Sequence, residues 1–370
     1  MVDLKSQYEK IKDEVNASIQ EVLDTNTYIN GPLVHQFQAD LEKYLGAKHV
    51  IPCANGTDAL QIAMMGLGLQ PGDEVITADF TFAATVEVIA LLQLTPVLVD
   101  VDMNNMNISL EGIRKAITPK TKAIVPVHLF GRAANMDAIM EIANAHNLYV
   151  IEDNAQAIGA DYSSKDGSKK KVGTIGHVAA TSFFPSKNLG CYGDGGAIYT
   201  NDDNLAHIIR GIVNHGMYER YHHDVVGVNS RLDSIQAGVL KAKLPHLDTY
   251  NKARQDAARK YSLALGVNKN IVAPTICESC DCHVFHQYVI RITNEKRDGL
   301  LAHLQEKGIP CAIYYPIPLH SQKAYADVRY KEEDFPVTNQ LCKEVIALPM
   351  HTELDDEQIK FITDTVLEYV

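Results

Sequence analysis

Hydrophobic and polar residues follow two different patterns along the first two thirds of the chain. Apolar residues three or four apart predict one amphipathic helix over 11–23, which ends before Gly31, and a second over 33–41, which ends before Gly46. Farther on, we expect strands over 50–53, 74–77, 96–100, 121–127, 148–152, 178–183 and 197–200, and helices over 58–69, 82–92 and 136–146. Short apolar runs that alternate with helices are typical of βαβ units. They predict an α/β fold with a mostly parallel sheet covered by helices on both faces.

The pattern changes in the last third of the chain. A long helix is predicted from residue 232 to about 265, with a kink at Pro245. After this helix we expect strands over 285–292 and 311–315, and helices over 299–307 and 355–368. We therefore predict a large α/β domain over 1–250 and a smaller α+β domain over 251–370. The lysine-rich stretch 165–171 is expected to be a solvated loop.

Composition and charge narrow the class of protein. The 370-residue chain has a net charge of −12, which argues against a nucleic-acid binder because such proteins carry a basic face. We expect no membrane partner, since there is no apolar signal region and no apolar run near the ~20 residues of a membrane span. The seven cysteines are irregularly spaced, which favours free thiols in a reducing cytoplasm. No metal is expected, because Cys277, Cys280, Cys282 and His283 are too closely spaced for a usual zinc site.

Lys187 is the first candidate for covalent chemistry. It lies between Ser182 and a glycine-rich run at 190–196, where a strand is expected to give way to a loop. Burial would lower the pKa of its amine and free the nucleophile, whereas an ordinary loop lysine would be solvated. Residues farther upstream help to decide between these two interpretations.

The segment 54–60 is a candidate anion site, because it links a predicted strand to a predicted helix. Gly56 would let an anion approach the free N–H groups of the helix, and Thr57 could add a hydroxyl donor. A plain N-cap by Thr57 or Asp58 is an equal alternative.

Two more candidates follow strands of the predicted sheet. Asp153 comes directly after the strand over 148–152, at the sheet edge where α/β proteins bind ligands. Its carboxylate would suit a protonated pyridine nitrogen, or it could cap a helix. Phe82 follows the strand over 74–77 and could stack on an aromatic ring, although an aromatic residue in such a position is more often part of the core.

Together these residues meet the needs of pyridoxal phosphate. The phosphate requires a helix N-terminus and hydroxyls, the ring requires a stacking face and an acid near its nitrogen, and the aldehyde requires a lysine. The order along the chain, with 54–60 first, then Asp153 and then Lys187, agrees with that cofactor.

The chain resembles the sugar-nucleotide aminotransferases of the DegT/DnrJ/EryC1/StrS family over nearly its whole length. The resemblance rests on the segments 55–60, 72–76, 80–85, 151–156 and 227–232, and on the Lys187 motif with its Gly-Asp-Gly-Gly tail at 193–196. It implies the fold of aspartate aminotransferase, which is fold type I of the enzymes that use pyridoxal phosphate. Within the family, the segments 191–196, 220–223 and 228–233 are similar to those of 3-aminotransferases that act on UDP-2-acetamido-2-deoxy-3-oxo-glucuronate.

The resemblance also implies roles for single residues. Lys187 would bind the cofactor aldehyde and move protons, and Asp153 would pair with the ring nitrogen. The other cofactor contacts would come from Gly56, Thr57, Asp58, Phe82, Gln156, Ser182 and, across a dimer, Asn229. The substrate contacts would come from Arg231, also across the dimer and meeting a carboxylate, and from Tyr314 and His320, with Tyr314 standing where a relative has histidine.

The sequence therefore predicts a cytoplasmic, homodimeric aminotransferase with shared active sites. It would move an amino group from an amino acid, expected to be glutamate, to a nucleotide-linked ketosugar for lipopolysaccharide O-antigen or another surface polysaccharide. Two alternatives stay open: a dTDP-3-oxo- or 4-oxo-6-deoxysugar as the acceptor, and a non-catalytic ligand sensor on the same fold. Lys187 excludes the related dehydratases, which carry histidine at this position.

Overall fold

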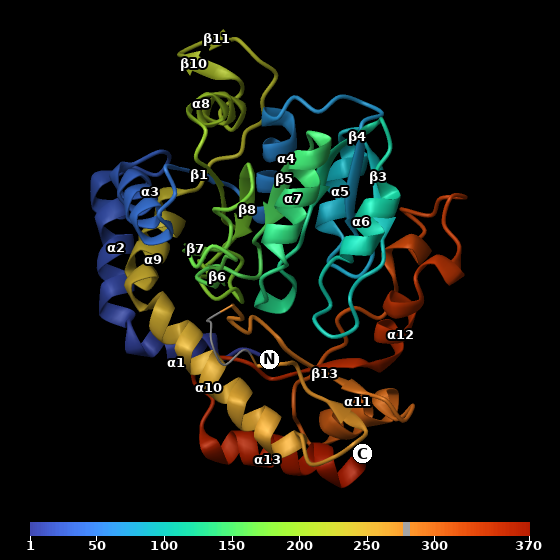
Figure 1. The fold of residues 1–370 in the computed structure, drawn as a ribbon. Helices are drawn as coiled ribbons and strands as arrows, with labels where there is room; N and C mark the ends of the chain where they lie inside the picture. The colour runs from blue at the N-terminus through green and yellow to red at the C-terminus, as the bar shows by residue number, and fades with distance from the viewer. Residues whose placement is uncertain (277–281) are drawn as a thin grey trace.

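A seven-stranded sheet lies at the centre of the computed structural model, which describes residues 1–276 and 282–370 (Figure 1). Its strand order is β1-β9-β8-β5-β4-β2-β3. The strands are β1 (His49–Cys53), β2 (Glu74–Ala78), β3 (Thr95–Val99), β4 (Thr121–Val125), β5 (Tyr149–Asp153), β8 (Val178–Ser182) and β9 (Gly196–Thr200). β9 pairs antiparallel with both β1 and β8, and the other neighbouring pairs in this sheet are parallel, so the prediction of an α/β fold with a mostly parallel sheet is confirmed.

Helices cover both faces of the sheet, because strands buried on both sides need apolar partners on each. On one face pack α4 (Gly56–Gly66), α5 (Ala84–Leu91) and α8 (Asp203–Ile212), and on the other α6 (Leu110–Ala116) and α7 (Met136–His146). The β1–β9 end is covered by α3 (Pro32–Leu45) and α9 (Ser234–Lys243), which in turn contact α1 (Leu4–Lys10) and α2 (Lys12–Thr25) (Figure 1). As predicted, α3 ends before Gly46, whose φ of +68° suits glycine.

A second, smaller sheet lies in the lower part of the molecule in Figure 1. It consists of β12 (Ile271–Val272), β13 (Tyr288–Ile292) and β14 (Val345–Leu348), packed against α10 (Leu247–Leu265), α11 (Arg297–Glu306) and α13 (Asp356–Tyr369). Between the two sheets lies α12 (Pro336–Glu344), whose apolar side joins the core of the large sheet. The predicted kink at Pro245 is a 3₁₀ turn between α9 and α10. The boundary at residue 250 falls inside α10, so the division into two domains stays a prediction.

Two predictions of local structure were wrong. In the lysine-rich stretch, residues 165–168 form an exposed turn as expected, but Lys169–Lys171 form β7, which pairs with β6 (Asp161–Ser163). The carboxylate of Asp161 lies 3.1 Å from Lys169 Nζ and 3.0 Å from Lys171 Nζ, and so offsets the like charges of the lysines. The segment 311–315 is not a strand and contributes one isolated bridge, from Ala312 to Ala347. Its apolar residues pack on the core of the large sheet instead.

A hairpin projects from the body of the molecule just before residues 229–231. It is formed by β10 (Met217–Glu219) and β11 (His222–His223) and is seen at the top of Figure 1. Large apolar and aromatic side chains on this segment, Tyr221 and Val226, are exposed. No helix in the described part of the chain has the length and apolar character needed to cross a membrane.

Candidate active site

The N-terminus of α4 and the end of β8 form a narrow cradle. Asn55 is the N-cap of this helix, because its Oδ1 accepts a hydrogen bond of 2.8 Å from the N–H of Asp58. The alternative that Thr57 or Asp58 is the cap is therefore wrong. A Cβ on Gly56 would come within 2.7 Å of the Cβ of Ser182, so only glycine allows the helix to approach β8 this closely. The first N–H groups of a helix have no intrahelical acceptor, which suits an anion such as phosphate.

Lys187 and Asp153 form the charged centre of the site. Asp153 is the last residue of β5, and burial raises the pKa of its carboxyl group. Two hydrogen bonds oppose that shift: the Thr85 hydroxyl donates to Oδ2 at 2.8 Å, and the N–H of Ala155 donates to Oδ1 at 3.1 Å. Burial lowers the pKa of Lys187 to about 8, although the charge of Asp153 works in the opposite direction. The amine therefore has the desolvated character that a nucleophilic lysine needs.

Aromatic rings surround Gln156 on the other side of the site. Gln156 is held in one orientation, because its Oε1 accepts from the N–H of Phe130 at 2.6 Å and its Nε2 donates to the hydroxyl of Tyr315 at 3.3 Å. The ring of Tyr315 lies 5.9–6.4 Å from those of Phe80, Phe82 and Phe130, measured between centroids. Phe82 is 57% exposed, so its ring is open to a flat ligand rather than enclosed in the core.

The segment that carries Asn229 and Arg231 is anchored close to the cradle. Ser230, between these two residues, is buried, and its hydroxyl accepts a hydrogen bond of 3.1 Å from the N–H of Ala54. Asn229 forms an isolated backbone bridge with Asn214, and Nη1 of Arg231 donates to Oδ1 of Asn214 at 3.1 Å. These contacts are with the loop after α8 and not with the charged centre.

The other two predicted substrate residues differ in their surroundings. The backbone N–H of His320 donates to Oδ1 of Asp79, and its ring Nδ1–H donates to Oδ2 of the same residue. Both distances are 2.7 Å. Its ring stacks on Phe335 with the centroids 4.4 Å apart, and Nε2 has no partner among the described residues. Tyr314 is half-buried next to Tyr315. The role of both side chains toward a sugar stays a prediction.

Sequence reasoning missed Thr85 and Tyr315. The hydroxyl of Thr85 binds a carboxylate 68 positions away, and nothing local to the threonine signals that pairing. The available signal for Tyr315 was the pair of tyrosines before Pro316, from which only Tyr314 was chosen. No group of three metal-binding side chains occurs in the described ranges, and Cys277 and Cys280, two of the closely spaced cysteines, lie outside them.

Comparison with known proteins agrees with this geometry. The profile of the DegT/DnrJ/EryC1/StrS aminotransferase family matches residues 9–367. The chain is 48% identical to a UDP-2-acetamido-2-deoxy-3-oxo-D-glucuronate aminotransferase of Pseudomonas aeruginosa, over 98% of this chain and 97% of that protein. It is 46% identical to a pleiotropic regulatory protein of Geobacillus stearothermophilus, over 100% of this chain and 98% of that protein. The crystal structure of DesV from S. venezuelae with a ketimine intermediate superposes with a TM-score of 0.94, at 39% identity over 100% of this chain and 97% of that one.

The site fits the cofactor of these enzymes. The cradle at Gly56 suits the phosphate, the open ring of Phe82 suits stacking, and Asp153 and Lys187 suit the ring nitrogen and the aldehyde. The chain therefore belongs to the DegT/DnrJ/EryC1/StrS aminotransferase family and is a sugar aminotransferase that depends on pyridoxal phosphate.

Proposed function

We propose that the enzyme transfers an amino group from glutamate to the 3-oxo carbon of UDP-2-acetamido-2-deoxy-3-oxo-glucuronate, as a step toward a surface polysaccharide. The P. aeruginosa relative, at 48% identity, is named for this sugar. Within one family, however, the sugar is selected by a few side chains, so the argument depends on residues that can recognise a carboxylate.

The observation that carries the proposal is the unpaired guanidinium of Arg231. This side chain is half-buried and donates to Asn214, and within the described residues it forms no salt bridge with a carboxylate. A planar guanidinium matches a carboxylate through two parallel N–H···O bonds. A sugar acid would supply the missing negative charge, whereas a neutral sugar would leave Arg231 unpaired. Sites built on such polar contacts can reject the analogue that lacks them by ~10⁴-fold.

In the proposed mechanism, each residue at the charged centre has one task. Bound pyridoxal phosphate supplies an electron sink that makes a substrate C–H bond acidic. Lys187 moves that proton, because an amine with a pKa of about 8 can both accept and return a proton near neutral pH. Asp153 holds a proton at the ring nitrogen, and the hydrogen bond from Thr85 favours its ionised form and fixes its orientation.

We also propose that the active site is shared within a homodimer. The β10–β11 hairpin projects from the body and exposes Tyr221, and Val226, which follows it, is exposed as well; both suit burial against a second copy of the chain. Asn229 and Arg231 follow a few residues after this hairpin. In the dimer, they would serve the cofactor and the sugar of the other subunit.

The reverse reaction with 2-oxoglutarate tests the substrate. The wild type should deaminate UDP-N-acetyl-3-amino-glucuronate and should leave the matching sugar with a 6-hydroxymethyl group unchanged. Arg231→Ala should lose this preference but keep the coloured cofactor. Equal rates on both sugars would refute the uronate and favour the dTDP-deoxysugar alternative. Absence of turnover with every sugar tested would favour a ligand sensor, in line with the regulatory name of the G. stearothermophilus relative.

A further inference from the structure

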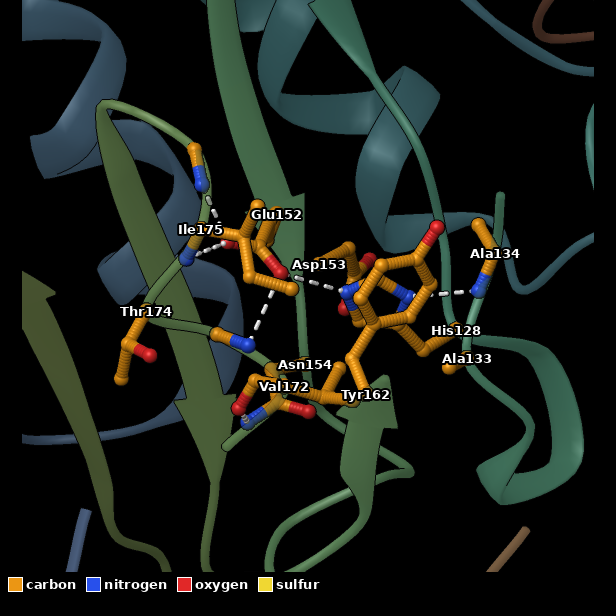
Figure 2. Close-up of polar contacts among 12 residues, drawn as sticks. His128, Ala133, Ala134, Glu152, Asp153, Asn154, Tyr162, Val172, Thr174 and Ile175 are labelled. Atoms are coloured by element: carbon orange, nitrogen blue, oxygen red, sulfur yellow. Dashed lines mark hydrogen bonds and ion pairs between the residues drawn. The ribbon is translucent and has the colours of Figure 1, made fainter. Parts of the chain in front are cut away.

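Two buried titratable side chains, His128 and Glu152, lie next to Asp153 and have no task in the proposed mechanism (Figure 2). Both are completely shielded from solvent, and Nε2 of His128 is 3.0 Å from Oε2 of Glu152. A buried carboxylate is costly unless its hydrogen bonds are satisfied, so its presence beside the catalytic aspartate calls for a reason.

The carboxylate of Glu152 has all the hydrogen bonds that it can accept. Oε1 accepts from the N–H groups of Ile175 at 2.7 Å and Gly176 at 2.5 Å, and Oε2 accepts from the N–H of Gly173 at 2.8 Å and from His128. Burial by itself would raise the pKa of Glu152, but His128 and the backbone N–H groups outweigh it and hold the pKa below its ordinary value. Glu152 is therefore ionised at neutral pH.

The hydrogen bonds of His128 determine where its proton lies. Nδ1 accepts a hydrogen bond of 3.1 Å from the N–H of Ala134, so Nδ1 carries no proton. The proton is on Nε2, from which the neutral ring donates to Glu152. Figure 2 shows the ring held between these two partners, and any rotation of the ring would break both bonds.

This pair connects the two segments that carry the cofactor residues. The backbone N–H of His128 donates to the carbonyl of Asp153 at 3.1 Å, and the N–H of Asp153 donates to the carbonyl of Pro126 at 2.9 Å. On its other side, Glu152 holds the turn at 173–176, which leads into β8 and so to Ser182. Successive strand residues point to opposite faces, so Glu152 anchors β5 on one face while Asp153 acts on the other.

We propose that Glu152 and His128 are a positioning pair, which fixes the end of β5 and thereby aims the carboxylate of Asp153 at the ring nitrogen of the cofactor. The inference rests on the proposed role of Asp153. A pair that served folding alone would change only the stability of the protein. A positioning pair must also change how the folded protein holds the cofactor.

Three variants and a control separate these roles. His128→Phe keeps a ring of similar size and removes both of its hydrogen bonds, and Glu152→Gln turns one acceptor into a donor that faces other donors. His128→Gln keeps an N–H group for Glu152 and serves as the rescue. Tyr261→Phe is the control, because it removes a buried hydrogen bond of 3.1 Å to Pro349 beside the small sheet, away from β5.

The measurements are the melting temperature of the cofactor-free protein, the dissociation constant of pyridoxal phosphate, and the visible circular dichroism of the bound cofactor. In His128→Phe and Glu152→Gln, the dissociation constant should rise about tenfold or more and the dichroic band should weaken. His128→Gln should recover most of both signals. Tyr261→Phe should lower the melting temperature and leave cofactor binding unchanged.

Wild-type cofactor affinity and an unchanged dichroic band in His128→Phe would overturn the positioning role. If His128→Phe does not fold, Glu152→Gln decides by the same two signals. Failure of the positioning role would appear only in the variants, whereas failure of the proposed function would appear in the wild type itself as a lack of transamination.

Discussion

Replacing Thr85 by valine would remove one hydroxyl from the active site and leave its shape almost unchanged. The Thr85 hydroxyl donates to Oδ2 of Asp153 at 2.8 Å, and both side chains are buried. A hydrogen bond to a charged group contributes about 1.5–3 kcal/mol, and its loss leaves a buried charge poorly satisfied. Thr85→Val should therefore destabilise the folded, cofactor-free protein by about 1.5–3 kcal/mol at neutral pH. It should also raise the pKa of Asp153 further, because this bond favours the ionised form.

The loss of stability should depend on pH. Burial raises the pKa of Asp153 in the folded protein above its unfolded value, so the folded protein takes up this proton first as the pH falls. A protonated carboxyl group gains less from the Thr85 hydroxyl than a carboxylate does. The difference between wild type and Thr85→Val should therefore be largest above the folded-state pKa of Asp153 and should shrink as the pH falls through it.

Urea unfolding of the cofactor-free protein, followed by far-ultraviolet circular dichroism at a series of pH values from neutral downward, measures this difference. Thr85→Ser keeps the hydroxyl and is the matched control, which should lie closer to the wild type. Equal stability of wild type and Thr85→Val near neutral pH would refute the role assigned to the bond. A loss of the same size across the whole pH range in which the protein folds would refute its dependence on the charge of Asp153.

The remaining predictions concern the cofactor and the dimer. Asp153→Asn should bind the cofactor but turn over at least ~10-fold more slowly, because an amide does not hold a proton on the ring nitrogen. Gly56→Ala should weaken cofactor binding, measured by absorbance titration, since its Cβ would lie 2.7 Å from that of Ser182; unchanged affinity would contradict the cradle. Lys187→Ala and Asn229→Ala should each be inactive, yet mixed dimers should regain activity, because one of their two sites carries neither defect. No recovery after proven subunit exchange would mean that each site is self-contained.

The periodicity of apolar residues was sufficient to predict most of the fold. Each predicted strand of the large sheet overlaps an observed one, from β1 to β9. This succeeded because a strand buried on both faces is apolar along most of its length, which leaves a clear signal in a short window. The segment 311–315 has a similar apolar character but is not a strand, because its backbone forms one isolated bridge, from Ala312 to Ala347, while the side chains of 313–315 pack on the core of the large sheet.

Charge patterns were a weaker guide than apolar patterns. The lysine-rich stretch 165–171 was expected to be a solvated loop, yet its last three residues form β7. The strand is stabilised by Asp161 on the opposite strand, and a carboxylate that lies eight or more positions away is invisible to a local reading of charge. The effect of a charge depends on its neighbours in space, which the local sequence does not specify.

The sequence by itself determined the family, the fold class, the cofactor and the candidate residues, because these depend on motifs and periodicities that lie within short segments. Only the tertiary structure decided which groups support those residues. Thr85 reaches Asp153 across 68 positions, and His128 reaches Glu152 across 24. Such contacts arise where the segments that follow different strands meet at one edge of the sheet, and that meeting is set by strand order and packing rather than by any local pattern.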